Sequence, residues 1–521
     1  MTDPMPPTTE IAERQDGALP PGWAWTRLGE ISQLYGGGTP SREVPEYFTG
    51  NIVWLTPTEI PKSGISVISD SRERITAEGL RNSSARIVPG GTVLMTSRAS
   101  IGYVAIAGVD VTTNQGFANF VCENGINNLY LAYWLWSQAE TFKQKATGTT
   151  FKEIIKSKLR EFLIPVPPLP EQRRIVAKIE ELLTRLDAGV AALKRVQAAL
   201  KRYKAAVLKA ACEGRLVPQD PNDEPASKLL ERILAERRAK WEAELRAKGK
   251  GSKEGTHELP QMSSEEDSPE LPTGWTRTLI GHVFNVSYGL SESLSKTEAD
   301  SEFDVAVIRI PNVTEFGGLN LSHLKYFEMD IKIKERLKLH KGDVLFNWRN
   351  APKWIGRSTV FDKEGEYVNA SFLLKLRPYI VGYSKFTAFY MNYLRLSGYF
   401  MSIVNNAVNQ ANFNATRTSQ VEMPLPPLRE QERIADEVDR RMSVIEGLED
   451  IVATQMARAE KLHQSILKRA FEGRLVAQDA NDEPAGVLLE RIQKERKSAK
   501  PEQRLVTHSS KIGATVKRRN R

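Results

Sequence analysis

Side chains that can hydrogen-bond to nucleic-acid bases and phosphates gather in a few short stretches of the sequence. Arg, Lys, Asn and Gln carry donors and acceptors that read base edges in the DNA major groove, while Ser, Thr and backbone amides hold phosphates. In the first half of the chain the candidates are Thr39, Ser41, Arg42, Ser97, Arg98, Ser100, Thr149, Thr150 and Lys152. In the second half they are Asn347, Trp348, Arg349, Asn350, Lys353, Asn409, Gln410, Asn412 and Asn414. Residues of these types on loops are the candidates to contact a nucleic acid, if one is the partner.

Several of these stretches also have a purely structural interpretation. The run Gly36 to Gly38 brings backbone N–H groups close to a phosphate or simply makes a tight turn. Arg98 and Arg349 occupy matching places in two related stretches, GGTVLMTSR and KGDVLFNWR. A residue shared by two stretches that recognise different things discriminates poorly between bases, so phosphate contact or a structural ion pair is favoured for both arginines.

Amide side chains divide in the same way. Asn114 and Asn369 match each other in related stretches, which favours a turn or core role. The amide-rich run Asn405 to Asn414 has no counterpart in the first half of the chain. That run is therefore the stronger candidate for reading a specific sequence.

The sequence carries no recognisable catalytic or metal motif. It lacks a GxxxxGK[ST] phosphate loop, the Asn-Pro-Pro-aromatic or Asp-Pro-Pro-aromatic tetrapeptide of amino-methyltransferases, and an apparent nuclease cluster. Its six histidines form no HxxxH or HxE pattern, and Cys122 and Cys212 form no CxxC motif. We expect a chain without catalysis, metal or cofactor of its own, in which both cysteines are structural.

Length and charge set the broad class. A chain of 521 residues is long enough for three or four domains, and its net charge of +9 with a pI near 9.2 favours a polyanionic partner. No apolar run is long enough to cross a bilayer, and the first residues resemble no secretory signal. The sequence therefore predicts a cytoplasmic protein.

A duplication organises the chain. PVPPLPEQRRI, from Pro165 to Ile175, returns as PLPPLREQERI from Pro424 to Ile434, with eight of eleven positions identical. EGRLV, NDEPA and LLERI follow in both copies at the same offset, so no insertion was accepted there. The segments before these repeats match more loosely. Constant helical regions beside diverged modules are expected when each module recognises something different.

A long helix is predicted after each proline-rich repeat. Apolar residues from Ile175 to Ala210 recur every 3.5 residues on average, which is typical of a coiled-coil seam, and the second copy shows the same pattern from Ile434 to Ile466. Gly214 and Gly473 are suited to end the helices. We expect helices of about residues 171–213 and 430–472. The opposite net charges of residues 171–211 (+6) and 430–470 (−2) favour pairing of the two helices with each other, and a two-fold relation makes the pair antiparallel.

The order of these motifs resembles the specificity (S) subunit of a Type I restriction–modification system. The resemblance spans about residues 19–495 and rests on five motifs. These are LGEISQLYGGGTPS, NIVWLTPTEI, GGTVLMTSRASIGYVAI, TTNQGF and the doubled PxPPLxEQxxI. The first module fits the family pattern better than the second, where SYGLSESLSK replaces the Gly-Gly-Thr-Pro run.

This resemblance implies an α+β fold with two mixed α/β target-recognition domains, joined by two long antiparallel coiled-coil helices and duplicated about a pseudo-two-fold. Each domain would read one half of a bipartite site in double-stranded DNA. The expected boundaries are 1–18 (disordered N-terminus), 19–164 (first recognition domain), 165–248 (first helical region), 249–270 (linker), 271–423 (second recognition domain), 424–497 (second helical region) and 498–521 (basic disordered tail).

The resemblance also implies partners. Two modification (methyltransferase) subunits would dock near Glu171, Gln172, Glu430 and Gln431, and near the EGRLV to LLERI segments, and restriction (translocase/nuclease) subunits would join through them. S-adenosylmethionine, ATP and Mg²⁺ would then be bound by the partners. Two alternatives remain open: a self-contained DNA adenine methyltransferase, disfavoured by the missing tetrapeptide, and a coiled-coil scaffold unconnected to DNA.

Overall fold

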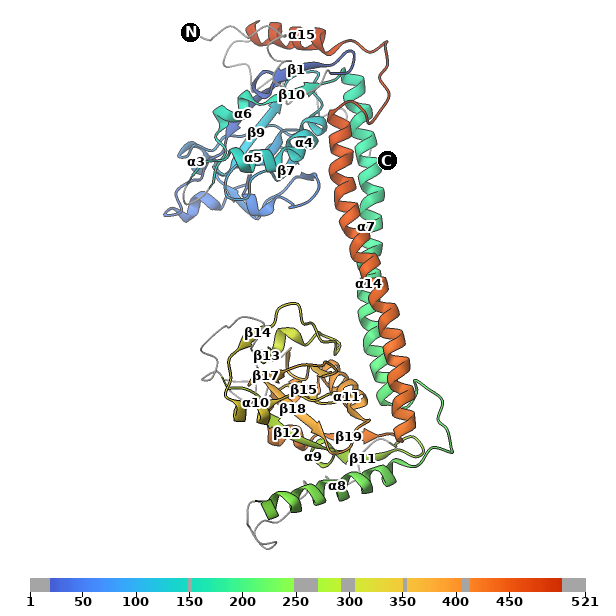
Figure 1. Cartoon of the computed structure of the whole chain (residues 1–521). Helices are drawn as coiled ribbons and strands as arrows, with labels where there is room; N and C mark the ends of the chain where they lie inside the picture. The colour runs from blue at the N-terminus through green and yellow to red at the C-terminus, as the bar shows by residue number, and fades with distance from the viewer. Residues whose placement is uncertain are drawn as a thin grey trace. The chain divides into compact units, whose positions relative to one another are not determined.

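The computed structural model describes residues 19–148, 152–247, 270–291, 305–349, 354–404 and 413–498. It divides into two compact units, which are residues 1–192 with 455–521, and residues 193–454. We call these the first and the second unit. Each contains one globular module and a part of both long helices (Figure 1).

The two long helices are α7 (Leu169–Cys212) and α14 (Leu428–Phe471), each of 44 residues. Both begin directly after a proline-rich strand and end at a glycine with positive φ, 68° at Gly214 and at Gly473. Glycine adopts this conformation without the steric cost that a Cβ brings, and it commonly ends helices for that reason. The predicted helices are confirmed to within two residues at each end.

Three sheets form the globular module of the first unit. Strand β1 (Ala24–Arg27) pairs antiparallel with β10 (Leu163–Val166), so the start of the module is held beside the strand that leads into α7. The main sheet has the order β2-β9-β6-β7-β4, with bounds Ser32–Gly36, Phe117–Cys122, Val93–Thr96, Val104–Ala107 and Ser66–Ile68. A smaller sheet has the order β5-β3-β8, with bounds Glu73–Ile75, Ile52–Leu55 and Thr112–Thr113.

Short helices complete this module. They are α2 (Leu28–Ile31), η1 (Pro45–Phe48), η2 (Pro57–Glu59), α3 (Ala77–Arg81), α4 (Asn128–Ser137), α5 (Ala139–Lys145) and α6 (Lys156–Glu161). Helix α4 is buried almost all round, from Tyr130 to Leu135, because the main sheet lies on one side of it and the long helices on the other.

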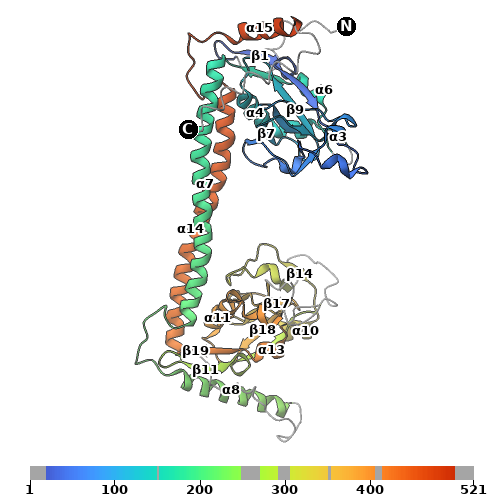
Figure 2. The same ribbon diagram turned by 180° about the vertical axis from the view of Figure 1, so that it is seen from behind.

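One core joins this module to helices from both ends of the chain. It contains Ile175 and Ile179 from the start of α7, Ile466 from the end of α14, and Leu488 and Ile492 from α15 (Ala485–Ser498). Helix α15 lies beside β1 in both views of the molecule (Figures 1 and 2).

The second unit repeats the plan. Strand β11 (Thr276–Leu279) pairs with β19 (Glu422–Leu425). The main sheet has the order β12-β18-β15-β16, with bounds Phe284–Tyr288, Leu373–Pro378, Val344–Asn347 and Ser358–Val360. The smaller sheet has the order β14-β13-β17, with bounds Lys325–Phe327, Val305–Ile308 and Tyr367–Asn369. The helices are α8 (Ala226–Ala247), α9 (Ile280–Val283), η5 (Ile310–Asn312), α10 (Ile331–Leu337), α11 (Ser384–Leu396), α12 (Tyr399–Val404) and α13 (Ala415–Ser419).

The core of the second unit unites Val207 at the end of α7 with Ile434 at the start of α14, and adds Leu229 and Ile233 of α8. In each unit, the start of one long helix packs beside the end of the other, so the two helices pair antiparallel there. The predicted fold, with two mixed α/β modules and two long antiparallel helices, is confirmed.

The structure shows where the LLERI segments pack. Helix α15, within residues 424–497, packs against the first module, and α8, within residues 165–248, packs against the second. The apolar face of each segment is buried inside the chain, at Leu229, Ile233, Leu488 and Ile492, and is not available to a partner. No helix in the described part of the chain is long and apolar enough to cross a membrane.

Candidate nucleic-acid interface

The ends of equivalent strands bring the predicted DNA-contacting segments together. Strands β2 and β6 both run antiparallel to β9, so the segments that follow them leave the main sheet at the same edge. Strands β12 and β15 have the same relation to β18 in the second unit. We call this place in each unit the strand-end surface.

The glycine run after β2 is required by close packing. A Cβ at Gly37 would lie 2.0 Å from the carbonyl oxygen of Asn114, and one at Gly38 would lie 2.3 Å from the backbone nitrogen of Ala85. The N–H of Gly38 donates to the carbonyl of Thr113 at 2.8 Å, so it is not open to a phosphate. A Cβ at Gly289 of the second unit would likewise lie 2.1 Å from the carbonyl oxygen of Asn369. Close packing therefore accounts for Gly37 and Gly38.

Arg42 lies four residues after Gly38 and is held in a fixed orientation. Its Nη1 and Nη2 donate to the two carboxylate oxygens of Glu73 at 2.5 and 2.7 Å, and its guanidinium lies 4.1 Å from the ring centroid of Phe48. The hydrogen bond raises the pKa of Arg42 and lowers that of Glu73. Nearby, the Thr39 hydroxyl bonds to the side chain of Gln115, and the Ser41 hydroxyl accepts from the N–H of Glu43 at 3.3 Å.

The second predicted stretch follows β6. Ser97 is fully buried, and its Oγ has no hydrogen-bond partner among the described residues, so it does not contact DNA in this conformation. Arg98 is partly exposed and lies 4.0 Å from Glu153, and Ala99 adopts a positive φ of 60°. Such a backbone conformation is uncommon for a residue with a Cβ. The exposed members of this stretch are therefore Arg98 and Ser100.

The third stretch joins the second by backbone hydrogen bonds. The N–H of Ala99 donates to the carbonyl of Lys152 at 3.0 Å, and the N–H of Ile154 donates to the carbonyl of Ser97 at 3.0 Å. Lys152 is exposed at this edge. Thr149 and Thr150 lie outside the described residues.

In the second unit, aromatic rings dominate the strand-end surface. The indole N–H of Trp348 donates to the carbonyl of Ser371 at 2.7 Å, and its ring meets Tyr288 edge-on at 5.3 Å between centroids. The guanidinium of Arg349 lies 5.9 Å from the Trp348 ring centroid and 5.6 Å from that of Phe372. A cation held over aromatic faces keeps a defined position while its N–H groups point outward.

The other predicted residues of this unit have structural roles or are not described. Asn347 is buried and donates to the carbonyl of Trp354 at 2.8 Å, and Asn414 caps α13 by accepting from the N–H of Arg417 at 2.9 Å. The N–H of Phe413 donates to the carbonyl of Trp348 at 2.9 Å, which brings the end of the amide-rich run to the same surface. Asn350, Lys353, Asn409, Gln410 and Asn412 lie outside the described residues.

The matched amides are structural, as expected from their presence in both modules. The side-chain oxygen of Asn114 accepts from the N–H of Gly116 at 2.9 Å in a turn. Asn369 is fully buried and donates to the carbonyl of Leu373 at 2.7 Å.

Sequence reasoning missed one residue of this surface, Tyr288. Its side chain is 46% exposed, meets the Trp348 ring edge-on, and accepts from the N–H of Ala415 at 3.2 Å. The available signal was its position directly before Gly289, where the second module lacks the Gly-Gly-Thr-Pro run.

The repeated Glu-Gln pair lies inside the chain. The indole N–H of Trp23 donates to Glu171 at 3.1 Å, and that of Trp275 donates to Glu430 at 2.9 Å. Burial raises the pKa of both carboxyl groups. These contacts tie the LPxGW segment of each module to the first turn of the following long helix.

The glutamines beside them have internal partners too. Gln172 donates to the carbonyl of Pro167 at 3.0 Å and accepts from the N–H of Asn127 at 2.8 Å, and Gln431 donates to the carbonyl of Pro426 at 2.8 Å. All four side chains are at most 2% exposed. The prediction that Glu171, Gln172, Glu430 and Gln431 contact a partner is corrected, because their side chains do not reach the surface.

The possible metal ligands and the two cysteine thiols show no arrangement suited to chemistry in the described part of the chain. Within the described residues, no group of three or more His, Cys, Asp or Glu side chains could hold a metal ion. Burial raises the pKa of the Cys122 thiol to about 12, and Cys212 is buried as well. Neither thiol is activated for chemistry at neutral pH.

Comparison with known proteins agrees with this arrangement. The model of the Type I restriction modification DNA specificity domain matches residues 20–201 and again residues 272–449. The chain is 40% identical over 169 residues to the Type I restriction enzyme MjaIX specificity subunit of Methanocaldococcus jannaschii, a match that spans 32% of this chain and 39% of that protein. It is 23% identical over 512 residues to the Type I restriction enzyme EcoKI specificity subunit of Escherichia coli K12, covering 92% and 97%.

A solved structure shares the fold. The chain aligns, with a TM-score of 0.59 and 21% identity, to a protein from a study of complex assembly and conformational transition of the type I R-M system. The alignment covers 88% of this chain and 100% of that one. Since the family model covers well over half of the sequence, in the two places where the two modules lie, the chain belongs to the family of Type I restriction–modification DNA specificity subunits.

Proposed function

We propose that this chain supplies the DNA sequence specificity of a Type I restriction–modification complex, with each module reading one half of a bipartite site. One observation carries the proposal. Both units keep the residues that build the strand-end surface, such as Gly37 and Gly289, and differ in the side chains exposed there. The first unit presents Arg42, whereas the second presents Tyr288 and Trp348, each beside the arginine that both units share, Arg98 or Arg349.

The chain contributes recognition and no chemistry of its own to this proposed function. Methylation and cleavage would come from modification and restriction subunits, which would also bind S-adenosylmethionine, ATP and Mg²⁺. A self-contained methyltransferase would instead bind S-adenosylmethionine itself. Binding of S-adenosylmethionine to the isolated chain, measured by calorimetry, would favour that alternative.

An exposed apolar row on the long helices is the best docking surface for a modification subunit. In the second unit Val444, Leu448 and Ile451 form this row on α14, and α7 exposes Val196 and Tyr203 two turns apart; each is between 43% and 57% exposed. The buried seam of α14 passes through Ile445 and Val452, so this row is a second stripe beside it. Helices bury such a stripe against further helices, and a helical segment of the partner is the expected occupant.

The test of the function is single-molecule methylation mapping in cells that carry this chain and its modification subunit. A bipartite motif is expected. Exchange of residues 19–160 for the same region of a relative should change only one half of the motif, and a change in both halves would contradict independent modules.

A binding experiment tests the strand-end surface directly. Arg349→Ala should weaken binding of the complex to its cognate duplex about tenfold, since a lost base or phosphate contact costs roughly 1–3 kcal/mol. The matched control is Arg336→Ala on α10, an exposed arginine away from this surface. Equal effects of the two substitutions would show that only general positive charge matters.

A further inference from the structure

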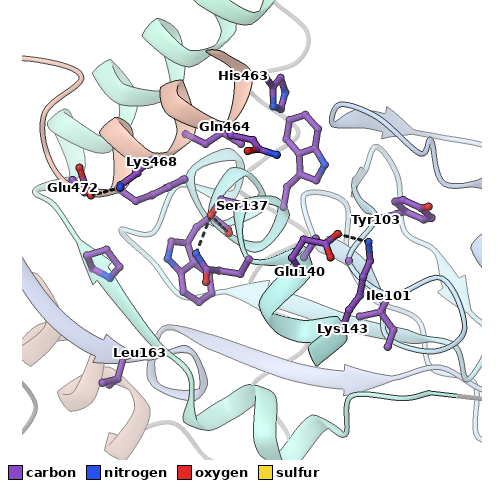
Figure 3. A pocket seen from close by; sticks show the side chains of 18 of the residues that line it. Ile101, Tyr103, Ser137, Glu140, Lys143, Leu163, His463, Gln464, Lys468 and Glu472 are labelled. Carbon is purple, nitrogen blue, oxygen red and sulfur yellow. Dashed lines mark hydrogen bonds and ion pairs between the residues drawn. The ribbon is translucent and has the colours of Figure 1, made fainter. Parts of the chain in front are cut away.

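The first unit contains a cavity of about 850 Å³ between its globular module and the last part of α14 (Figure 3). Figure 3 shows His463, Gln464, Lys468 and Glu472 on one side of it, and Ser137, Glu140 and Lys143 from the α4–α5 corner on the other. Trp134, Trp136 and Leu467 add an apolar lining.

The lining suits an uncharged ring. Trp136 and His463 meet edge to face with 4.6 Å between ring centroids, and burial lowers the pKa of His463, which favours the neutral imidazole. Charged groups around the opening are largely paired with each other. Lys143 lies 2.6 Å from Glu140, and Lys468 lies 3.9 Å from Glu472.

The second unit fills the equivalent space with its own chain. Glu315 forms an ion pair with Lys201 of α7 at 2.8 Å, and Arg395 donates to the backbone carbonyl of Glu315. The next residue, Phe316, packs against the core, and the ammonium of Lys204 lies 5.0 Å from its ring centroid.

The loops that carry these residues correspond between the units. Helices η2 and η5 occupy the same place in the two modules, each directly after a strand of the smaller sheet. Each is followed at the same distance by a glycine with positive φ, 74° at Gly64 and 94° at Gly317. Counted from these glycines, Lys62 stands in the place of Glu315, and Ser63 stands in the place of Phe316.

The helix positions correspond as well. The constant offset between the two helical repeats places Glu460 where α7 has Lys201, and His463 where α7 has Lys204. In the second unit the acid, Glu315, is on the loop and the base, Lys201, is on the helix. In the first unit the base, Lys62, is on the loop and the acid, Glu460, is on the helix, and both line the cavity. The ring of Phe316 has no counterpart on the loop of the first unit, since Ser63 is too small to reach across.

We infer that this cavity is a docking slot for an aromatic side chain of the modification subunit, which completes in the first unit the packing that Phe316 completes in the second. The inference rests on the proposed function. The occupant needs no charge of its own, since the lining carries residues of both signs, Lys62 on the loop and Glu460 on α14. An aromatic side chain fits because the same position in the second unit holds one, against an equivalent helix.

Two variants place a ring at the slot. Gln464→Trp adds one from a residue of α14 that lines the cavity, and Ser63→Phe adds one directly beside the lining residue Lys62, at the loop position that matches Phe316. Their matched controls are Val67→Phe, at a side chain that is 65% exposed, and Ser465→Trp, the next exposed position on the helix, neither of which lines the cavity.

The readout is titration of the full-length chain with its modification subunit, followed by native mass spectrometry and calorimetry. The wild-type chain and both controls should bind two copies. Each plugged variant should bind one copy as before and the other at least tenfold more weakly, because the slot exists in the first unit alone. Unchanged affinity at both places in both plugged variants would overturn the inference and leave the proposed function standing. Absence of any binding to the wild-type chain would overturn both.

Discussion

Truncation of one buried leucine in the last helix tests which module that helix stabilises. Leu488 of α15 is 2% exposed and packs in the core of the first unit, where its Cδ1 would lie only 2.3 Å from a Cβ added at Gly125. Leu488→Ala removes three carbon atoms from a close-packed site. Buried Leu→Ala substitutions cost about 2–5 kcal/mol, partly from lost burial and partly from the cavity that remains.

That cost predicts a measurable change in local opening. Since about 1.4 kcal/mol corresponds to a factor of ten, amides that exchange through opening of the first unit should exchange at least about 25-fold faster. Hydrogen–deuterium exchange read by mass spectrometry should show this in β1, β10 and α4. Peptides from β11, β19 and α11 of the second unit should be unchanged.

Two matched variants make the test decisive. Val487→Ala changes the neighbouring residue, which is 49% exposed, and should leave both units unchanged. Leu229→Ala alters the equivalent leucine of α8 and should loosen the second unit instead. The reasoning is refuted if Leu488→Ala loosens the second module instead of the first.

Three further predictions concern other parts of the chain. Trp275→Phe leaves the buried carboxylate of Glu430 without its indole donor. The free energy of unfolding, measured in urea melts, should fall by about 1–3 kcal/mol. Equal stability would show that water replaces the donor. Burial lowers the pKa of Lys375 to about 8, so between pH 8 and about 10 the unfolded chain binds more protons than the folded one. The wild type should therefore gain stability relative to Lys375→Met as pH rises through that window, and parallel pH profiles would contradict this. A four-residue insertion after Gln197 lengthens α7 by about 6 Å. Methylation mapping should then show a longer spacer between unchanged half-sites. An unchanged spacer in an active complex would refute the idea that the helix sets the spacer length.

The regular elements were the most predictable part of this protein. Proline-rich strands, a 3.5-residue apolar period and terminal glycines locate both long helices, because each signal has a local physical cause. The prediction of which seam residues are buried was less accurate. Val196, Tyr203, Leu448 and Leu462 fit the period but are exposed, since the structure buries only the stripe that faces the other helix.

The site was only partly predictable. Arg98 and Arg349 lie on the strand-end surfaces, whereas Ser97 and Asn347, predicted with them, are buried. A polar residue that caps a helix or fills a core looks the same in sequence as one that faces a ligand. Long-range contacts were missed for a related reason. The pairing of Trp23 with Glu171 and of α15 with the first module joins residues far apart, and local periodicity carries no record of such contacts.

The position of α15 has a consequence for synthesis of the protein on the ribosome. Chains emerge from the N-terminus, and domains generally fold as they become complete. The second module finds its helix α8 already made before its first strand appears, whereas the first module lacks Ala485, Leu488 and Ile492 until nearly the whole chain has been translated. During that interval an apolar patch beside β1 and α4 stays open to chaperones and to other nascent chains. The N-terminal module, although made first, is therefore expected to reach its final stability last.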